Sequence, residues 1–388
     1  MVRGLATLLV AAASAADLWS VMRASDAACA ASAAGRRVAA FIDDDSPRGV
    51  VFVPDPSRGG LGTETNRFLH VAALGLALGR GICLNMSASP SYRFLAPKIP
   101  IQYPCNITQS VRFSEASFED LRDPAIAVLF DRVPIVSPYA GLMKRIADLV
   151  GSDYMDVVAC LSVAWLRPGP EVRERARPFL YAFRHSVSVG VHMRTADTAM
   201  IREQCYQPGS HGCGGRGLRL AFHNRANCIA DDDQLIATLA TTVLPSCVAK
   251  DTDVAIFIAA DHPVVGTSWL DERGAARLGN ATVLTTAGRP QHTGRPSPLA
   301  SHAEAEFKAV FDFLLLTETT VYVSNCDLRC NFWVRQGKCG NSFASNVMIR
   351  RAAPQLALTS LFAPRSPGNF TCPARLSTSI GALGAPPS

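Results

Sequence analysis

The sequence has few charged side chains, few aromatic side chains and only five lysines. Charged residues make up 18% of the 388 residues, and aromatic residues make up 7%. The 38 basic and 32 acidic side chains give a formal charge of +6, but Lys and Arg form no dense run. The missing run argues against a nucleic-acid partner. The hydrophobic share of 48% predicts a folded core rather than wholesale disorder.

Two motifs of common hydrolases are also missing. Arg184-His185 does not continue into the R-H-G-x-R pattern of one phosphatase class, and no G-x-S-x-G nucleophile elbow occurs. An unrelated secreted hydrolase, with Arg and His in its pocket, is therefore an alternative that no motif in the sequence supports. Release of inorganic phosphate from phosphomonoesters would support it.

The first 16 residues are typical of a secretory signal peptide. Arg3 precedes an apolar run from Leu5 to Ala13, and small residues follow it. The run is shorter than the roughly 20 residues that cross a bilayer; an uncleaved anchor and a disordered Ala-rich start are the alternatives. We expect a location in the lumen of the endoplasmic reticulum or Golgi, or secretion. Contact with a membrane is expected only if the segment is kept as an anchor.

Cysteines and sequons agree with a secretory location. Twelve cysteines are too few for a disulfide-only scaffold but many for a cytosolic enzyme, and in an oxidising compartment most would pair. A zinc site with His211 is the alternative, but the spacing matches no paired C-x-x-C site, so no metal is expected. Cys205 and Cys213 could close a small loop, and Cys326, Cys330 and Cys339 cluster near a second loop. N-glycosylation is predicted at the sequons of Asn85, Asn106, Asn280 and Asn369.

The pattern along the chain predicts an α/β fold between two poorly ordered ends. Residues 17–46 are rich in Ala, Ser and Asp and are predicted to form a linker, and residues 353–388 form a Pro- and Ser-rich tail. Strands are predicted at 50–53 and 82–84, with a Gly-rich loop and a helix between them. Residues 89–137 show no regular pattern.

The second half of the chain predicts another parallel sheet. Apolar runs at 186–193, 254–260 and 320–323 read as strands, and helical patterns begin near Asp231 and Ser301 between them. Strands that alternate with helices are typical of parallel α/β sheets.

The first of these strands ends in the most informative side chains. Because strand side chains alternate, His192 and Arg194 project from the face opposite to Val191, at the C-terminal end of the strand. Ligands of open α/β sheets bind beyond such ends. A guanidinium there suits a phosphate, and Asp197 can hold the Arg or a ribose hydroxyl. The alternative is a strand edge with a salt bridge.

The other two strands also end in polar residues. Asp261 follows the second strand and either binds nucleotide hydroxyls or caps the next helix. Ser342 and Phe343 come after the third strand and before a predicted helix, where backbone N–H groups can cradle a phosphate. An ordinary helix start is the alternative reading there.

Together these segments resemble the motifs of fucosyltransferase-like enzymes, a family with α1,2-, α1,6- and protein O-fucosyltransferases. The Gly-rich segment 59–69 resembles the family's N-terminal loop and helix, and 165–172 is similar to the lead-in to the first motif. The resemblance covers residues 48–352. The three motifs occur in the family's order as His192-x-Arg194-x-x-Asp197, Ala260-Asp261 and Ser342-Phe343.

The resemblance implies a GT-B-like fold, with two Rossmann-like domains that face a cleft. Residues 47–184 would form the acceptor-side domain and residues 185–352 the domain that binds GDP-fucose. Family members invert the anomeric carbon and generally use no metal, so the donor needs no cofactor. The implied nucleotide-sugar-binding residues are Gly60, Gly62, His192, Arg194, Asp197, Asp261, Ser342 and Phe343.

The resemblance also assigns catalytic roles. Arg194 would stabilise the charge that develops on the β-phosphate as the bond to fucose breaks. Glu64 is a candidate for the general base that the acceptor hydroxyl needs. Its alternative role is to complement the dipole of the helix that it begins, and Asp197 is then the other candidate base.

Two departures from the family pattern leave the acceptor open. Many O-fucosyltransferase relatives carry Asn-Gln where this chain has Thr63-Glu64. Several relatives carry a second Arg where Thr195 stands, which points away from the α1,6 branch. A protein or a glycan hydroxyl would be the acceptor. A secreted non-catalytic protein of the same fold that binds nucleotide sugar or glycan is the alternative function.

Overall fold

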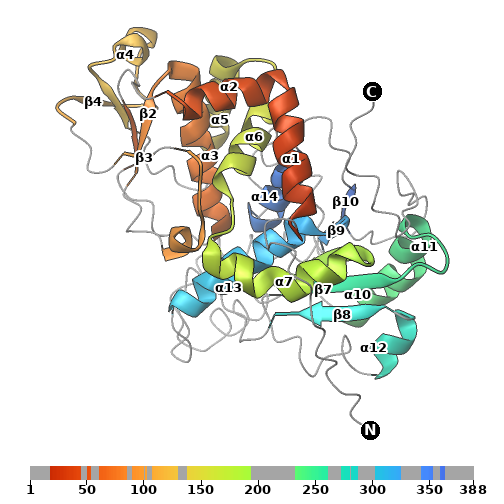
Figure 1. Cartoon of the computed structure of the whole chain (residues 1–388). Helices are drawn as coiled ribbons and strands as arrows, with labels where there is room; N and C mark the ends of the chain where they lie inside the picture. The colour runs from red at the N-terminus through yellow and green to blue at the C-terminus, as the bar shows by residue number, and fades with distance from the viewer. Residues whose placement is uncertain are drawn as a thin grey trace, which may run out of the picture.

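Two five-stranded parallel sheets form the framework of the chain (Figure 1). The order of strands is β3-β2-β1-β5-β4 in the first sheet and β10-β9-β6-β7-β8 in the second. The computed structural model describes residues 18–44, 50–53, 61–84, 90–99, 101–102, 107–129, 138–193, 232–260, 272–279, 281–286, 302–324, 342–352 and 359–362.

The first sheet is built on the strand–helix–strand unit that the sequence predicted. Its strands are β1 (Val50–Val53), β2 (Gly81–Leu84), β3 (Ile101–Gln102), β4 (Ser110–Arg112) and β5 (Ala127–Leu129). Helix α3 (Leu61–Leu78) connects the paired strands β1 and β2. The helix ends at Gly79, whose φ of 62° is a left-handed conformation that favours glycine. The predicted irregular stretch 89–137 contains β3, β4 and β5, which are two or three residues long.

The three apolar runs of the second half form the centre of the second sheet. Its strands are β6 (Val187–Met193), β7 (Val254–Ala260), β8 (Thr282–Thr285), β9 (Val321–Ser324) and β10 (Thr359–Phe362). β6 pairs with β7 along its whole length and with β9 on its other side. β10 lies in the segment that was predicted to be a loose tail, so that prediction is wrong for residues 359–362.

The remaining helices connect and cover the two sheets. The predicted helices that begin near 231 and 301 are present, and α6 is an additional buried helix. The helices are η3 (Pro90–Phe94), α4 (Phe118–Arg122), α5 (Pro138–Val150), α6 (Tyr154–Trp165), α7 (Pro170–Arg184), α10 (Asp232–Thr238), η4 (Leu239–Val243), α11 (Leu244–Cys247), α12 (Glu272–Arg277), α13 (His302–Glu318) and α14 (Ser342–Arg351).

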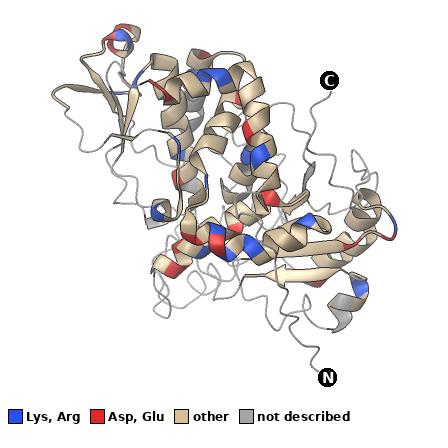
Figure 2. Ribbon diagram, in the orientation of Figure 1, with Lys and Arg blue, Asp and Glu red and all other residues tan. Residues whose placement is uncertain are grey.

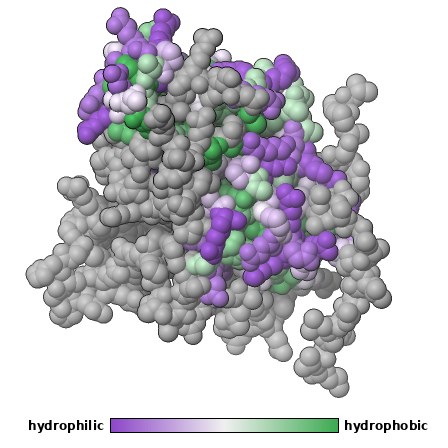
Figure 3. All heavy atoms as spheres, turned by 60° about the vertical axis from the view of Figure 1, so that its left-hand side comes forward, coloured by the Kyte–Doolittle hydropathy of each residue, from purple (hydrophilic) through white to green (hydrophobic). Residues whose placement is uncertain are grey.

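The described surface is mixed in charge and hydropathy. Along α7, basic residues are interspersed with acidic residues, and Arg175 and Glu171 form an ion pair at 3.0 Å (Figure 2). Figure 3 shows hydrophilic and hydrophobic areas side by side on one face. Among the described residues, the large hydrophobic side chains that stay exposed are Phe118 and Met155. None of the described helices combines the length and apolar character needed to cross a bilayer.

Two N-terminal helices occupy the segment that was predicted to be a linker. They are α1 (Ser20–Ala31) and α2 (Ala33–Ile42), and the Ser32 side chain between them accepts a hydrogen bond from the backbone N–H of Gly35 at 2.9 Å. The linker prediction is therefore wrong for residues 20–42. Alanine is the strongest helix former. The buried residues of α1 and α2 lie at helical spacing, but they are few, and the Ala-rich composition around them shows no clear apolar period.

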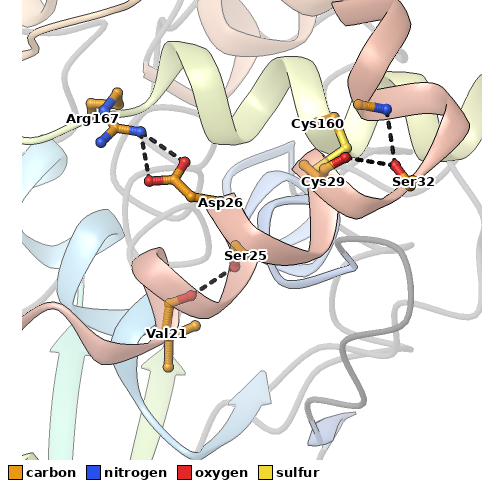
Figure 4. The surroundings of a disulfide bond; sticks show 8 residues. Val21, Ser25, Asp26, Cys29, Ser32, Cys160 and Arg167 are labelled. Carbon is orange, nitrogen blue, oxygen red and sulfur yellow. Dashed lines mark hydrogen bonds and ion pairs between the residues drawn. A yellow bond between two sulfur atoms is a disulfide. The ribbon is translucent and has the colours of Figure 1, made fainter. Parts of the chain in front are cut away.

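Helix α1 is attached to the elements around the first sheet by a disulfide and an ion pair. Cys29 is bonded to Cys160 of α6, with 5.6 Å between their Cα atoms (Figure 4). The Arg167 guanidinium nitrogen Nη1 donates to both carboxylate oxygens of Asp26, at 2.8 and 3.0 Å. The disulfide supports the expectation of an oxidising compartment.

The start of α1 is also bonded to the end of α13, beside the second sheet. The buried carboxylate of Glu318 accepts hydrogen bonds from the backbone N–H groups of Val21 and Met22, at 2.9 and 2.8 Å. Burial raises the pKa of Glu318 to about 7, although Arg350 and the two backbone donors act in the opposite direction. Helix α1 therefore bridges elements of both sheets.

Glu318→Gln is expected to remove a pH dependence of stability. The pKa of Glu318 is about 7 in the fold, against an ordinary value of 4.5. The folded chain therefore holds this proton more tightly than the unfolded chain. The resulting stabilisation is complete below the ordinary pKa and is lost as the pH rises through 7. The shift corresponds to about 3 kcal/mol.

Urea unfolding at about pH 5 and about pH 8 measures this effect. The difference between the two pH values should be smaller in Glu318→Gln than in the wild type. Glu174→Gln, on the exposed face of α7, is the matched control and should behave as the wild type does. Equal pH dependence in the wild type and Glu318→Gln would contradict the prediction.

Candidate functional site

Both sheets contain a switch point, where the order of strands reverses, and His192 lies at that of the second sheet. The chain passes from β6 outward to β7 and β8, and then returns to add β9 on the other side of β6. In the register of β6 and β9, His192 is opposite Ser324, at the carboxyl ends of the two strands. The first sheet has the same kind of reversal between β1 and β5, and α3 follows β1. Such switch points are where open α/β sheets bind ligands.

The alternation of side chains along β6 orients His192 as the sequence predicted. Val187, Val189, Val191 and Met193 belong to one buried cluster, with residues of α10 and η4. The side chain of His192 is on the opposite face and is 7% exposed. Burial on both sides of the strand explains why its seven residues are all apolar or small apart from His192.

His192 contacts a residue of the third sequence motif. Its ring stacks on the ring of Phe343 in the first turn of α14, with 4.8 Å between centroids and 21° between planes. Phe343 in turn meets Phe313 of α13 edge-on at 5.3 Å. Ser342 and Phe343 were expected before a helix, and they are its first two residues. Two motifs that are far apart in the sequence therefore meet at the switch point of the second sheet.

Helix α14 also reaches the Gly-rich segment of the first sheet. The Asn346 side-chain nitrogen Nδ2 donates a hydrogen bond to the backbone carbonyl of Gly62, at 2.7 Å. Gly62 is in the first turn of α3, so the N-terminal turns of α3 and α14 face each other. The Gly-rich segment and the helix that carries the third motif are thus in direct contact.

Glu64 lies in a buried polar group next to this contact. Its side chain is 5% exposed. The pKa of Tyr92 is raised well above its ordinary value by burial, and further by the charges of Glu64 and Glu306, against the effect of Arg67. The hydroxyl of Ser91 donates to the carboxylate of Glu306. The candidate base therefore shares a low-dielectric region with a second carboxylate and a tyrosine.

The far end of α14 carries two buried arginines, Arg350 and Arg351. Arg351 donates to the backbone carbonyls of Thr317 and Thr320, at 3.1 and 3.0 Å, and to that of Thr319. Burial lowers the pKa of both Arg350 and Arg351 to about 10, against the nearby charge of Glu318. These contacts fix α14 to the end of α13, and so they set where its first turn lies.

Several predicted residues lie outside the described part of the chain. Within that part, no group of three or more His, Cys, Asp or Glu side chains is placed to hold a metal ion. The residues outside it include the proposed phosphate-binding Arg, the loop cysteines and all four sequons. They are Gly60, Arg194, Asp197, Asp261, Cys205, Cys213, Cys326, Cys330, Cys339, His211, Asn85, Asn106, Asn280 and Asn369.

Three buried polar residues of α3 and α14 were not predicted from the sequence. Asn346, Thr65 and Asn66 are each at most 1% exposed. The signal that could have indicated them is a polar side chain at an otherwise apolar, helix-buried position. Their sequence gives no sign of the partner, because Asn346 and Gly62 are 284 residues apart.

The comparison with known proteins gives matches in structure only. No family model matches the chain, and no curated protein matches it. A structure of POFUT1 in complex with GDP is 14% identical, with a TM-score of 0.45, over 82% of this chain and 99% of that chain. A point mutant of Arabidopsis thaliana FUT1 in complex with GDP is 12% identical, with a TM-score of 0.43, over 90% of this chain and 80% of that chain.

A third match is to a solved α-1,6-fucosyltransferase. NodZ, co-crystallised with GDP, is 10% identical with a TM-score of 0.39, over 75% of this chain and 91% of that chain. All three matches have TM-scores below 0.5 and identities of 14% or less.

Proposed function

We propose that the protein is an inverting glycosyltransferase of the GT-B type that transfers fucose from GDP-fucose to a protein or glycan hydroxyl. The observation that carries the proposal is the stack of His192 on Phe343. It joins two motifs of the resembled family at the carboxyl end of β6, at a switch point where α/β sheets bind ligands. The elements around the second sheet would hold the donor, and those around the first would receive the acceptor.

The reaction requires that the negative charge developing on the leaving phosphate is stabilised. The acceptor oxygen attacks the anomeric carbon, the bond from that carbon to the β-phosphate oxygen breaks, and GDP leaves with the electron pair. Arg194 would stabilise the growing negative charge on the β-phosphate, and His192 would orient the pyrophosphate or Arg194. Asp261, Ser342 and Phe343 would hold the guanosine and the phosphates. No cofactor is needed in this scheme.

The acceptor hydroxyl needs a base that takes its proton. We assign this role to Glu64, with Asp197 as the alternative. Glu64 is buried, and its charge acts on Tyr92 together with that of Glu306. Complementing the dipole of α3 is its other role. The disulfide of α1 supports a location in the secretory pathway, where protein and glycan acceptors are found.

Turnover of GDP-fucose by the purified protein tests the proposal. Release of GDP and a rise of the melting temperature with added GDP are the expected results. Neither hydrolysis nor transfer, together with no thermal shift by GDP, would refute it. A thermal shift without transfer to any of a panel of protein and glycan acceptors would support the binding protein instead. The Thr63-Glu64 departure from the family pattern favours that second candidate.

A further inference from the structure

The contact between Asn346 and Gly62 joins the elements of the two sheets at the candidate site. The donor is a side-chain amide on α14, and the acceptor is the main-chain carbonyl in the first turn of α3. Asn346 is fully buried, with 0% exposure. A hydrogen bond at 2.7 Å in such a place is strong and directional, because water does not compete for either group.

Asn346 and two residues that follow Gly62 in α3 carry unsatisfied buried polar atoms. Within the described part of the chain, the side-chain oxygen Oδ1 of Asn346 has no hydrogen-bond partner. The same holds there for the Thr65 hydroxyl and for both amide atoms of Asn66. Thr65 and Asn66 are three and four residues after Gly62, so they share its face of α3. Buried polar atoms without partners cost free energy, and they persist where a bound group or a change of conformation satisfies them.

Asn346 also lies between the residues proposed for the donor side and those proposed for the acceptor side. It is one turn after Phe343, which contacts His192 at the donor side. Its partner Gly62 is two residues before Glu64, the candidate base on the acceptor side. A shift of α14 on binding a nucleotide would therefore be transmitted to the first turn of α3 through this bond.

We infer that Asn346 is a positioning residue that couples occupancy of the donor site to the placement of the α3 first turn. The inference rests on the proposed function. The donor's affinity is set by groups of the second sheet, whereas the reaction also needs the first turn of α3 in place. Loss of the bond should therefore lower kcat and leave binding of GDP almost unchanged. A displacement of about 1 Å at a reacting group can cost up to about 100-fold in rate.

Asn346→Ala and Asn346→Asp test the inference. Alanine removes the donor, and aspartate replaces it with a carboxylate that cannot donate to the Gly62 carbonyl. We expect kcat to fall about 10-fold or more in both, with the Kd of GDP within about 2-fold of the wild type. Arg37→Ala is the matched control, because it removes another bond between distant parts of the chain, that from Arg37 of α2 to Asp153, and lies outside the candidate site. It should leave kcat near the wild-type value.

Hydrogen exchange with and without GDP distinguishes coupling from a purely structural role, because a purely structural role would not change how GDP protects α3. In the wild type, GDP should slow exchange in the first turns of both α14 and α3. In the two variants, protection of α14 should stay and protection of residues 61–66 should disappear. Unchanged kcat in both variants, or loss of GDP binding and stability in parallel with kcat, would overturn the inference. Absence of turnover and of GDP binding in the wild type would instead refute the proposed function.

Discussion

Arg194→Ala is expected to lower kcat for GDP-fucose about 100- to 1,000-fold. One charged donor that acts on a developing oxyanion is worth about 3 to 4 kcal/mol in the transition state. Arg194 comes directly after Met193, the last residue of β6. Because side chains alternate along a strand, the sequence predicts that it continues the face of His192, which contacts Phe343. A guanidinium there suits the phosphate oxygens of a leaving GDP.

Steady-state release of GDP measures the effect. If Arg194 acts chiefly in the transition state, kcat falls much more than KM rises. Arg184→Ala is the matched control, because Arg184 is an exposed arginine at the end of α7 and should leave kcat near the wild-type value. The melting temperature without ligand should be similar in all three proteins. Equal kcat in Arg194→Ala and the wild type would remove Arg194 from the mechanism and leave His192 as the nearest candidate.

Replacement of the disulfide by Cys29→Ser with Cys160→Ser should cost about 4 to 5 kcal/mol of stability. The two cysteines are 131 residues apart in the sequence. A cross-link that closes so long a loop removes much conformational entropy from the unfolded chain, and its loss restores that entropy. The double variant should also free α1 from α6, leaving the Asp26 ion pair with Arg167 and the hydrogen bonds to Glu318 to hold it.

Urea unfolding of the double variant and the wild type measures this difference. Asp26→Asn is the informative comparison, because it weakens the same contact of α1 and leaves the disulfide intact. We expect Asp26→Asn to cost clearly less than the double variant, since an ion pair that is partly exposed contributes little. A double variant as stable as the wild type would show that packing, Glu318 and the Asp26 ion pair hold α1 without the disulfide.

Local pattern was sufficient to predict the central strands and one face of the site. The runs 254–260 and 186–193 are long and apolar, so a buried parallel sheet is the arrangement that satisfies both faces. The alternation along β6 then predicts that His192 faces away from the valines, and the structure confirms this orientation. The same reasoning predicts the helix of α3 from its apolar spacing.

Short or compositionally biased segments could not be assigned in the same way. The four residues of β10 are too few to show a clear alternation, and they become a strand because they pair with β9 along its edge. Helices α1 and α2 were predicted to be a linker because their buried residues are largely small. Their stability depends on neighbours far along the chain, on Cys160 and on Glu318.

The sequence by itself determined the long apolar strands, the helices between them, and the side chains that end those strands. These are properties of neighbouring residues, set by backbone preference and by the period of apolar side chains. The tertiary structure alone decided that Phe343 covers His192, that Asn346 bonds Gly62 and that Glu318 caps α1. Those contacts depend on the order of strands in the two sheets and on how α14 and α13 pack between them. No local signal encodes them, because each joins residues that are far apart along the chain.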